Sequence, residues 1–314
     1  MKKYWGERAG GAGRVIPGRR RIYLPGDGMK KQETQGHPAL PAAVGALVLL
    51  LLGSVPAAEA VRRGLALCAG SVIPALFPFL TAVRFAVSCG LGQVLPGPAA
   101  ALLLGAVGGY PMGAAAVGQL YEAGQLRRED AQGLLCCCNN AGPAFILGYV
   151  GREILGSPSG GLLLWGVHLA SAAVMAALFF PRSSGGRLRD AAAPPPALGF
   201  VEAVRSSAVT MLEICGFVTV FSVVTGALQA AGAGSPLLLG ALELTCGAAL
   251  LPAGPEGFVM AAALLGWGGV SVHFQTAAVL SGTGLSLGRY LAAKAGQAAL
   301  SAVIAAGVVL SGAV

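Results

Sequence analysis

The chain has 314 residues, of which 55% are hydrophobic and 11% are charged, and its mean hydropathy is +0.72. A typical soluble domain has roughly 25% charged residues, so this composition excludes an ordinary soluble protein and indicates a polytopic membrane protein. The formal net charge of +8 does not indicate nucleic-acid binding, because +6 of it lies in residues 1–38 without any aromatic or helical readout pattern.

The N-terminal tail, residues 1–38, is basic, rich in glycine and aperiodic, which predicts disorder. Met29 and the two lysines after it would make an ordinary start, so whether residues 1–28 are translated stays open. A first apolar helix is predicted over residues 39–58, and the positive-inside rule places its basic flank in the cytoplasm. The apolar run has no clear cleavage site and further membrane segments follow it, which argues against a signal peptide.

Residues 59–180 form the first of two predicted membrane repeats. An amphipathic and then apolar segment, 59–92, comes first. Two segments follow, 98–124 and 129–155, each interrupted in the middle and joined by a short charged hairpin. Residues 161–180 are an uninterrupted apolar run of 20 residues, which can span a hydrocarbon core of roughly 30 Å.

A polar linker, residues 181–198, leads to the second predicted repeat, residues 199–314. This half has the same order of elements, beginning with a long helix over residues 200–232. Two interrupted segments and a final span follow, over residues 236–251, 256–282 and 287–310. The repeated order predicts an all-α bundle of two related repeats, with a site at the interface between them.

The interruptions carry the most informative residues. They read GGYPMG over 108–113, CCCNNAGP over 136–143 and GGVSVHFQ over 268–275. In hydrocarbon an unpaired backbone group is costly, so a break is tolerated only where it is buried in protein or lines a wet cavity. Glycine, proline and paired asparagines at such breaks indicate the binding site of a transporter.

The asparagine pair is the strongest candidate. Asn139 and Asn140 precede Gly142 and Pro143, so a helix should end there and restart with free N–H groups. Such a restarted N-terminus is suited to an anion. The alternative is that both amides only cap the two half-helices.

In the second half, Ser271, His273 and Gln275 follow a glycine pair. If this stretch is extended, all three side chains lie on one face. If it is helical, Ser271 and Gln275 share a face and His273 points away. A purely structural histidine is the alternative. The full predicted substrate-binding set is Tyr110, Asn139, Asn140, Gly142, Ser271, His273 and Gln275.

Two acids are predicted to couple transport to an ion. Glu243 is a lone acid near an expected break, where a desolvated carboxyl is suited to carry H⁺ or to coordinate Na⁺. Glu213 is the weaker candidate, because it could pair with Arg84 or Lys294 instead. Lys294 could also extend to the membrane interface rather than line a site. His168 stands alone in a straight span and is interpreted as structural.

The three motifs, in this order, resemble the signature of sporulation integral membrane proteins of the YlbJ type, which belong to the nucleoside-recognition (Gate) domain group. The resemblance covers about residues 40–312. It implies two Gate-like repeats with broken helices, similar to concentrative nucleoside transporters, in a spore-forming bacterium. It also implies movement of dipicolinic acid during sporulation, across the outer forespore membrane.

The sequence therefore predicts a transporter or permease for a small organic anion in the bacterial cell membrane. No cofactor is expected, and coupling to H⁺ or Na⁺ is left open. The alternatives are an ion-coupled nucleoside carrier and a non-transporting scaffold for sporulation partners. An enzyme is not expected, because no residue set for acyl transfer, zinc hydrolysis or ATP use is recognised. The expected partners are the lipid bilayer, the anion and either a second copy or sporulation membrane proteins, but no nucleic acid.

Overall fold

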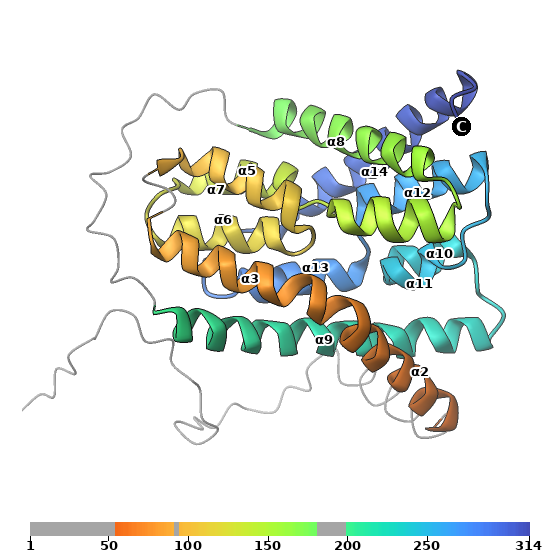
Figure 1. The fold of residues 1–314 in the computed structure, drawn as a ribbon, viewed down its shortest axis with the longest axis horizontal. Coiled ribbons are helices and arrows are strands. Elements are labelled where there is room, and N and C mark those ends of the chain that lie inside the picture. Colours follow the sequence, from red (N-terminus) through yellow and green to blue (C-terminus); the bar gives the residue numbers. More distant parts are fainter. Residues whose placement is uncertain (1–53, 91–93, 181–198) are drawn as a thin grey trace, which may run out of the picture. The chain divides into compact units, whose positions relative to one another are not determined.

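Helices account for all the regular structure in residues 54–90, 94–180 and 199–314, which are the residues that the computed structural model describes (Figure 1). They belong to one compact unit, Leu52–Val314. The all-α prediction is confirmed. A helix bonds its own backbone groups internally, which hydrocarbon requires. The predicted tail, most of the first apolar helix and the polar linker lie outside the described residues.

The first half begins with a long bent helix. It consists of α2 (Ser54–Leu67), the π-helical stretch η1 (Cys68–Val72) and α3 (Ile73–Ser88), which contains Pro78. The boundary predicted between residues 58 and 59 falls inside α2. The remaining elements of this half are α5 (Gly97–Gly108), α6 (Met112–Glu122), α7 (Arg128–Cys138), the π-helical η2 (Ala144–Ile154) and α8 (Pro158–Phe179).

The second half follows the predicted order. Its long helix is α9 (Phe200–Ala230), and its last element is the straight helix α14 (Leu287–Leu310). Between them lie two interrupted pairs, α10 (Pro236–Leu242) with α11 (Leu244–Ala248), and α12 (Pro255–Trp267) with α13 (Val270–Val279). An evolutionary repeat between the halves stays a prediction.

Several helices begin where the local sequence predicts it. The hydroxyls of Ser157, Ser235 and Ser286 accept hydrogen bonds from backbone N–H groups in the first turns of α8, α10 and α14, at 2.9, 3.2 and 3.3 Å. Pro158 and Pro236 follow two of these serines, where the missing N–H of proline costs nothing.

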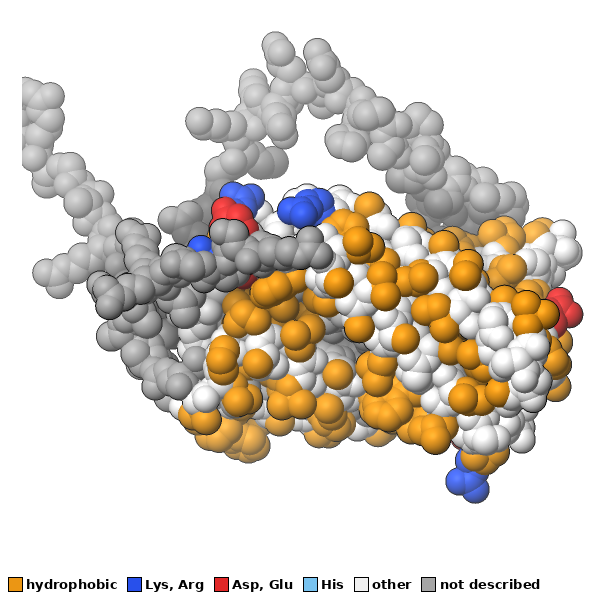
Figure 2. Space-filling model, turned by 90° about the horizontal axis from the view of Figure 1, so that it is seen from above, with side chains coloured by type: hydrophobic (Ala, Val, Ile, Leu, Met, Phe, Trp, Pro, Cys, Tyr) orange, Lys and Arg blue, Asp and Glu red, His pale blue; other side chains and the backbone are white. Residues whose placement is uncertain are grey.

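Four segments are long and apolar enough to cross a membrane: Pro158–Phe179, Phe200–Ala230, Pro255–Val279 and Leu287–Leu310. The third contains both α12 and α13 and is the innermost, since 67% of its most apolar window is buried, against 28–39% for the others. Hydrophobic side chains spread over the face seen in Figure 2, and the charged side chains visible there lie near its margins. The protein is therefore an integral membrane protein.

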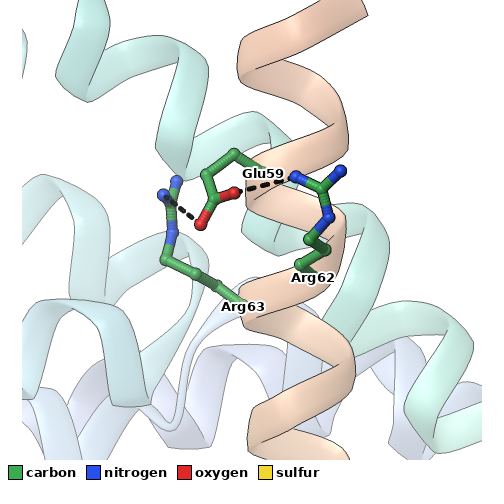
Figure 3. Close-up of polar contacts among 3 residues, drawn as sticks. All are labelled: Glu59, Arg62 and Arg63. Atoms are coloured by element: carbon green, nitrogen blue, oxygen red, sulfur yellow. Dashed lines mark hydrogen bonds and ion pairs between the residues drawn. The ribbon is translucent and has the colours of Figure 1, made fainter.

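Charged side chains lie near both ends of α9. On α2, Glu59 lies between Arg62 and Arg63, with N···O distances of 3.0 and 3.9 Å (Figure 3). A Cβ on Gly226, near the C-terminal end of α9, would lie 3.3 Å from Nη2 of Arg63. Arg205 is near the other end of α9, about 31 Å away at 1.5 Å per residue. Basic side chains, Arg63 and Arg205, therefore lie near opposite ends of this helix.

Two hydrophobic clusters pack inside the bundle, and the same helices contribute to both. On α8, Met175 belongs to the first cluster and Leu164 to the second. On α14, Tyr290 belongs to the first and Ala305 to the second. The buried polar side chains between these residues are His168 and Ser171 on α8, and Lys294, Gln297 and Ser301 on α14. His168 lies about 15 Å along α8, which is halfway, so a polar layer separates the two apolar cores.

The N-terminal part of α7 is bonded to the loop between α13 and α14. The Gln132 side chain donates to the Ser286 carbonyl at 2.8 Å and accepts from the Ser286 N–H at 2.6 Å. Arg128 donates to the Gly284 carbonyl at 2.9 Å. These contacts join the first half of the chain to the second at one end of the bundle.

Candidate functional site

Within each half, two helix breaks touch at glycine. A Cβ on Gly109, in the α5–α6 break, would lie 2.9 Å from the nitrogen of Gly142, in the α7–η2 break. A Cβ on Gly269, in the α12–α13 break, would lie 3.1 Å from the nitrogen of Leu244, at the α10–α11 break. Gly109 and Gly269 also have φ angles of +76° and +88°, which side chains disfavour. Glycine therefore permits both the turn and the close approach.

Tyr110 connects the breaks of the two halves. Its hydroxyl donates to the Leu265 carbonyl at 2.8 Å, near the end of α12. A Cβ on Gly268 would lie 3.0 Å from Cζ of Tyr110. The four breaks thus contact in series across the bundle. This arrangement satisfies the membrane's requirement that irregular backbone be covered by protein.

Asn139 holds the end of α7 against three other helices. Its amide nitrogen donates to the Thr276 hydroxyl on α13 at 2.9 Å and to the Tyr290 hydroxyl on α14 at 3.0 Å. Its amide oxygen accepts from the Ala114 N–H on α6 at 3.4 Å. Asn139 therefore does more than cap its own helix, and brings together residues from both halves.

Lys294 and Gln297 continue this network along α14. Lys294 Nζ donates to the Asn139 carbonyl at 3.1 Å and to Gln297 Oε1 at 2.7 Å, and lies 5.0 Å from the centre of the Tyr110 ring. Gln297 Nε2 donates to Asn140 Oδ1 at 3.0 Å. Lys294 is 0% exposed, so it does not extend to the interface. Among the described residues it forms no ion pair with Asp or Glu.

Two histidines lie at the edges of this network. His168 Nε2 accepts from the Ala141 N–H at 3.1 Å, so in the neutral ring the proton is on Nδ1. His273 Nδ1 is 3.1 Å from the Tyr290 hydroxyl, and its ring contacts Trp267 edge to face. His168 Nδ1 and His273 Nε2 have no hydrogen-bond partner among the described residues.

We call the network and these rings the polar belt: Asn139, Asn140, His168, Ser171, His273, Thr276, Tyr290, Lys294, Gln297 and Ser301.

A half-open cavity of about 320 Å³ lies beside the polar belt, between α5, α7 and α8. Asn140 is its polar wall, and it is lined elsewhere by Leu102, Ala106, Cys137, Cys138, Leu169, Ala172, Ala173 and Ala176. The volume lies within the usual range of small-molecule sites, roughly 300–1,000 Å³.

The predicted binding residues fall into two groups. Tyr110, Asn139, Asn140, Gly142 and His273 meet at the breaks or in the polar belt. Ser271 and Gln275 are buried on α13 and bonded to each other at 3.2 Å, and in the described part of the chain neither side chain is hydrogen-bonded to the belt. Residues 271–275 are helical, so Ser271 and Gln275 share one face of α13, as expected for a helix.

The two predicted coupling acids occupy different surroundings. Glu243 is 4% exposed, and its carboxylate accepts from the Cys246 N–H at 2.7 Å, which caps α11. Glu213 is exposed on α9 and forms no ion pair among the described residues. Neither acid is bonded to the polar belt in the described part of the chain.

Sequence reasoning missed most of the α14 contribution. Tyr290, Lys294, Gln297 and Ser301 recur every three or four residues, which puts them on one helix face. A stripe of polar residues in an otherwise apolar helix is the sequence pattern that could have predicted their contribution to the site.

The sequence also contains a run with G-x-S-x-G spacing, residues 284–288. It lies in the loop before α14, where Ser286 is the N-cap, and not at a strand-to-helix turn.

Comparison with known proteins agrees with the membrane assignment. The chain is 27% identical to the sporulation integral membrane protein YlbJ of Bacillus subtilis (strain 168), in an alignment of 308 residues that covers 78% of this chain and 76% of that protein. No family model matches the chain, and no solved structure matches it. The chain is thus similar, at a distance, to a sporulation membrane protein.

Proposed function

We propose that this protein is a permease for a small organic anion, and that dipicolinic acid is its substrate during sporulation. The observation that carries the proposal is the polar belt, because buried polar groups midway through apolar helices are costly and mark a substrate pathway. The belt lies where broken helices of both halves meet, which is where many secondary transporters bind substrate.

The similarity to a sporulation membrane protein supports the biological setting. The outer forespore membrane and a Gate-type fold are parts of the same proposal, and they rest on the motif resemblance. A non-transporting scaffold accounts less well for the polar belt, since a scaffold gains nothing from burying so many polar side chains between two apolar cores.

Uptake of labelled dipicolinate into proteoliposomes tests the proposal. The full-length protein is reconstituted with no gradient, with an imposed pH gradient and with an imposed Na⁺ gradient. Protein-free liposomes are the control for leakage. We expect protein-dependent uptake that unlabelled dipicolinate competes away. Uptake equal to that of empty liposomes under all three conditions would contradict the proposal.

Labelled uridine and adenosine, used in the same vesicles, test the nucleoside alternative. Amides such as Asn139, Asn140 and Gln297 could also bond a nucleoside. Saturable nucleoside uptake without dipicolinate uptake would show that the substrate is a nucleoside and not the anion.

A further inference from the structure

The cavity between α5, α7 and α8 joins an apolar surface to the polar belt. Most of its lining is alanine, leucine and cysteine, while Asn140 closes one side. Asn140 Oδ1 accepts from Gln297, whose own oxygen accepts from Lys294 Nζ. The Gln297 amide therefore links the side chain in the wall of the cavity to the Lys294 nitrogen, which also bonds the Asn139 carbonyl next to it.

The surroundings of Lys294 lack a negative charge. Its acceptors are the neutral oxygens of Asn139 and Gln297, and the Tyr110 ring lies nearby. A buried cation in an apolar bundle is costly unless an anion pairs with it. The described residues provide no such anion, so an anionic ligand would be the group that stabilises the charged form of Lys294.

His168, on α8, adds an unsatisfied donor to the polar belt. It precedes Leu169, which lines the cavity, and its Nδ1–H has no acceptor among the described residues. If Lys294 served only to hold the Asn139 carbonyl at the end of α7, neither the uncompensated charge nor this free N–H would be explained. A ligand with anionic oxygens accounts for both.

We infer that Lys294 is the charge-selecting residue of a carboxylate-binding site, with Asn140 at its entrance and the apolar body of the ligand in the α5–α7–α8 cavity. The inference rests on the proposed function and adds the residue that recognises the anion. Dipicolinate has two carboxylates on one ring, so one carboxylate would pair with Lys294 while the ring and the second carboxylate would lie in the cavity beside Asn140.

Binding of dipicolinate to the purified full-length protein in detergent tests the inference separately from transport. The ligand pair is labelled dipicolinate and its neutral analogue pyridine-2,6-dicarboxamide. The variants are Lys294→Met, which removes the charge, and Lys294→Arg, which keeps it. Arg205→Met is the matched control, because Arg205 is an exposed cation on α9.

The wild type should bind dipicolinate at least about tenfold more tightly than the diamide, a difference of about 1.4 kcal/mol. Lys294→Met should remove this preference, Lys294→Arg should keep part of it, and Arg205→Met should leave it unchanged. A stable Lys294→Met protein that binds dipicolinate as the wild type does overturns the inference and leaves the proposed function intact. A wild type that binds neither ligand overturns both.

A second variant tests the cavity in case Lys294→Met does not fold. Ala173 lines the cavity from an exposed position on α8, so Ala173→Leu should reduce its volume without a clash in the core. Ala170→Leu, also exposed on α8 but outside the lining, is its control. We expect Ala173→Leu to weaken dipicolinate binding at least about tenfold, and Ala170→Leu to leave it unchanged. Equal binding by both variants would overturn the cavity assignment.

Discussion

The α7–η2 break and the α10–α11 break both place buried polar residues between two half-helices, yet their side chains bond differently. At the first break, Asn139 and Asn140 reach residues of α6, α13 and α14. At the second, the Glu243 carboxylate bonds the backbone of its own next helix. The first break organises a network between the halves, and the second is capped locally.

A polar residue at a helix break can therefore have one of two structural roles. A local cap satisfies the free N–H groups that any helix start exposes. A side chain that bonds remote helices fixes their relative positions, and its loss leaves several buried partners unsatisfied. We therefore expect the two breaks to respond differently to substitution.

The largest effect should follow from replacing both amides of the first break. Asn139→Leu with Asn140→Leu removes one hydrogen bond from each of Thr276, Tyr290 and Gln297, at about 0.5–1.5 kcal/mol for each lost bond. Membrane insertion should persist, because leucine is more apolar. We expect dipicolinate uptake in proteoliposomes to be abolished and the thermal midpoint in detergent to fall. Wild-type uptake by the well-expressed double variant would show that the amides are dispensable.

A smaller loss should follow from adding a methyl group where the breaks of the two halves touch. Gly268 has a φ of +92°, and a Cβ there would lie 3.0 Å from the Tyr110 ring. Gly268→Ala should cost about 1–2 kcal/mol from the left-handed backbone, plus any displacement of Tyr110. Gly166→Ala on α8 is the control, since a Cβ at Gly166 meets nothing within 4 Å. Equal thermal midpoints for the two variants would contradict this expectation.

Replacing Glu243 tests the local cap and the ion coupling predicted from the sequence together. Glu243→Ala should lower stability by about 1 kcal/mol, the typical value of an N-cap. Glu243→Gln keeps an acceptor oxygen, so it should retain the fold. If Glu243 carries the coupled proton, Glu243→Gln should bind dipicolinate but lose the response of uptake to a pH gradient. Unchanged pH-driven uptake by this stable variant would remove Glu243 from the coupling mechanism.

Glu213→Gln should have the smallest effect of these changes. The side chain is exposed on α9 and forms no ion pair among the described residues. Substitutions at such positions usually change stability by less than about 0.5 kcal/mol. We expect uptake within about twofold of the wild type, since twofold corresponds to less than 0.5 kcal/mol. Loss of ion-driven uptake in a stable Glu213→Gln protein would instead support its predicted coupling role.

Much of the fold follows from the sequence, because the signals are local. Long apolar runs predict membrane helices, and glycine, proline and serine mark their ends. Hence the ranges predicted for the broken segments agree with α5 to η2 and with α10 to α13. Tyr110, Asn139 and Asn140 stand out because polar residues at breaks are rare in apolar chains.

The composition and the order of residues by themselves determined that this is an all-helical membrane protein with interrupted helices. Only the tertiary structure decided which polar groups meet. Lys294 bonds the carbonyl of Asn139 although 155 positions separate them, while Glu243 bonds a neighbour in its own turn. A helix start or a break depends on a few adjacent residues, but the partner of a buried side chain depends on how distant helices pack. Lys294 could therefore be interpreted from sequence as a residue that extends to the interface, whereas packing buries it between two apolar cores beside the asparagine break.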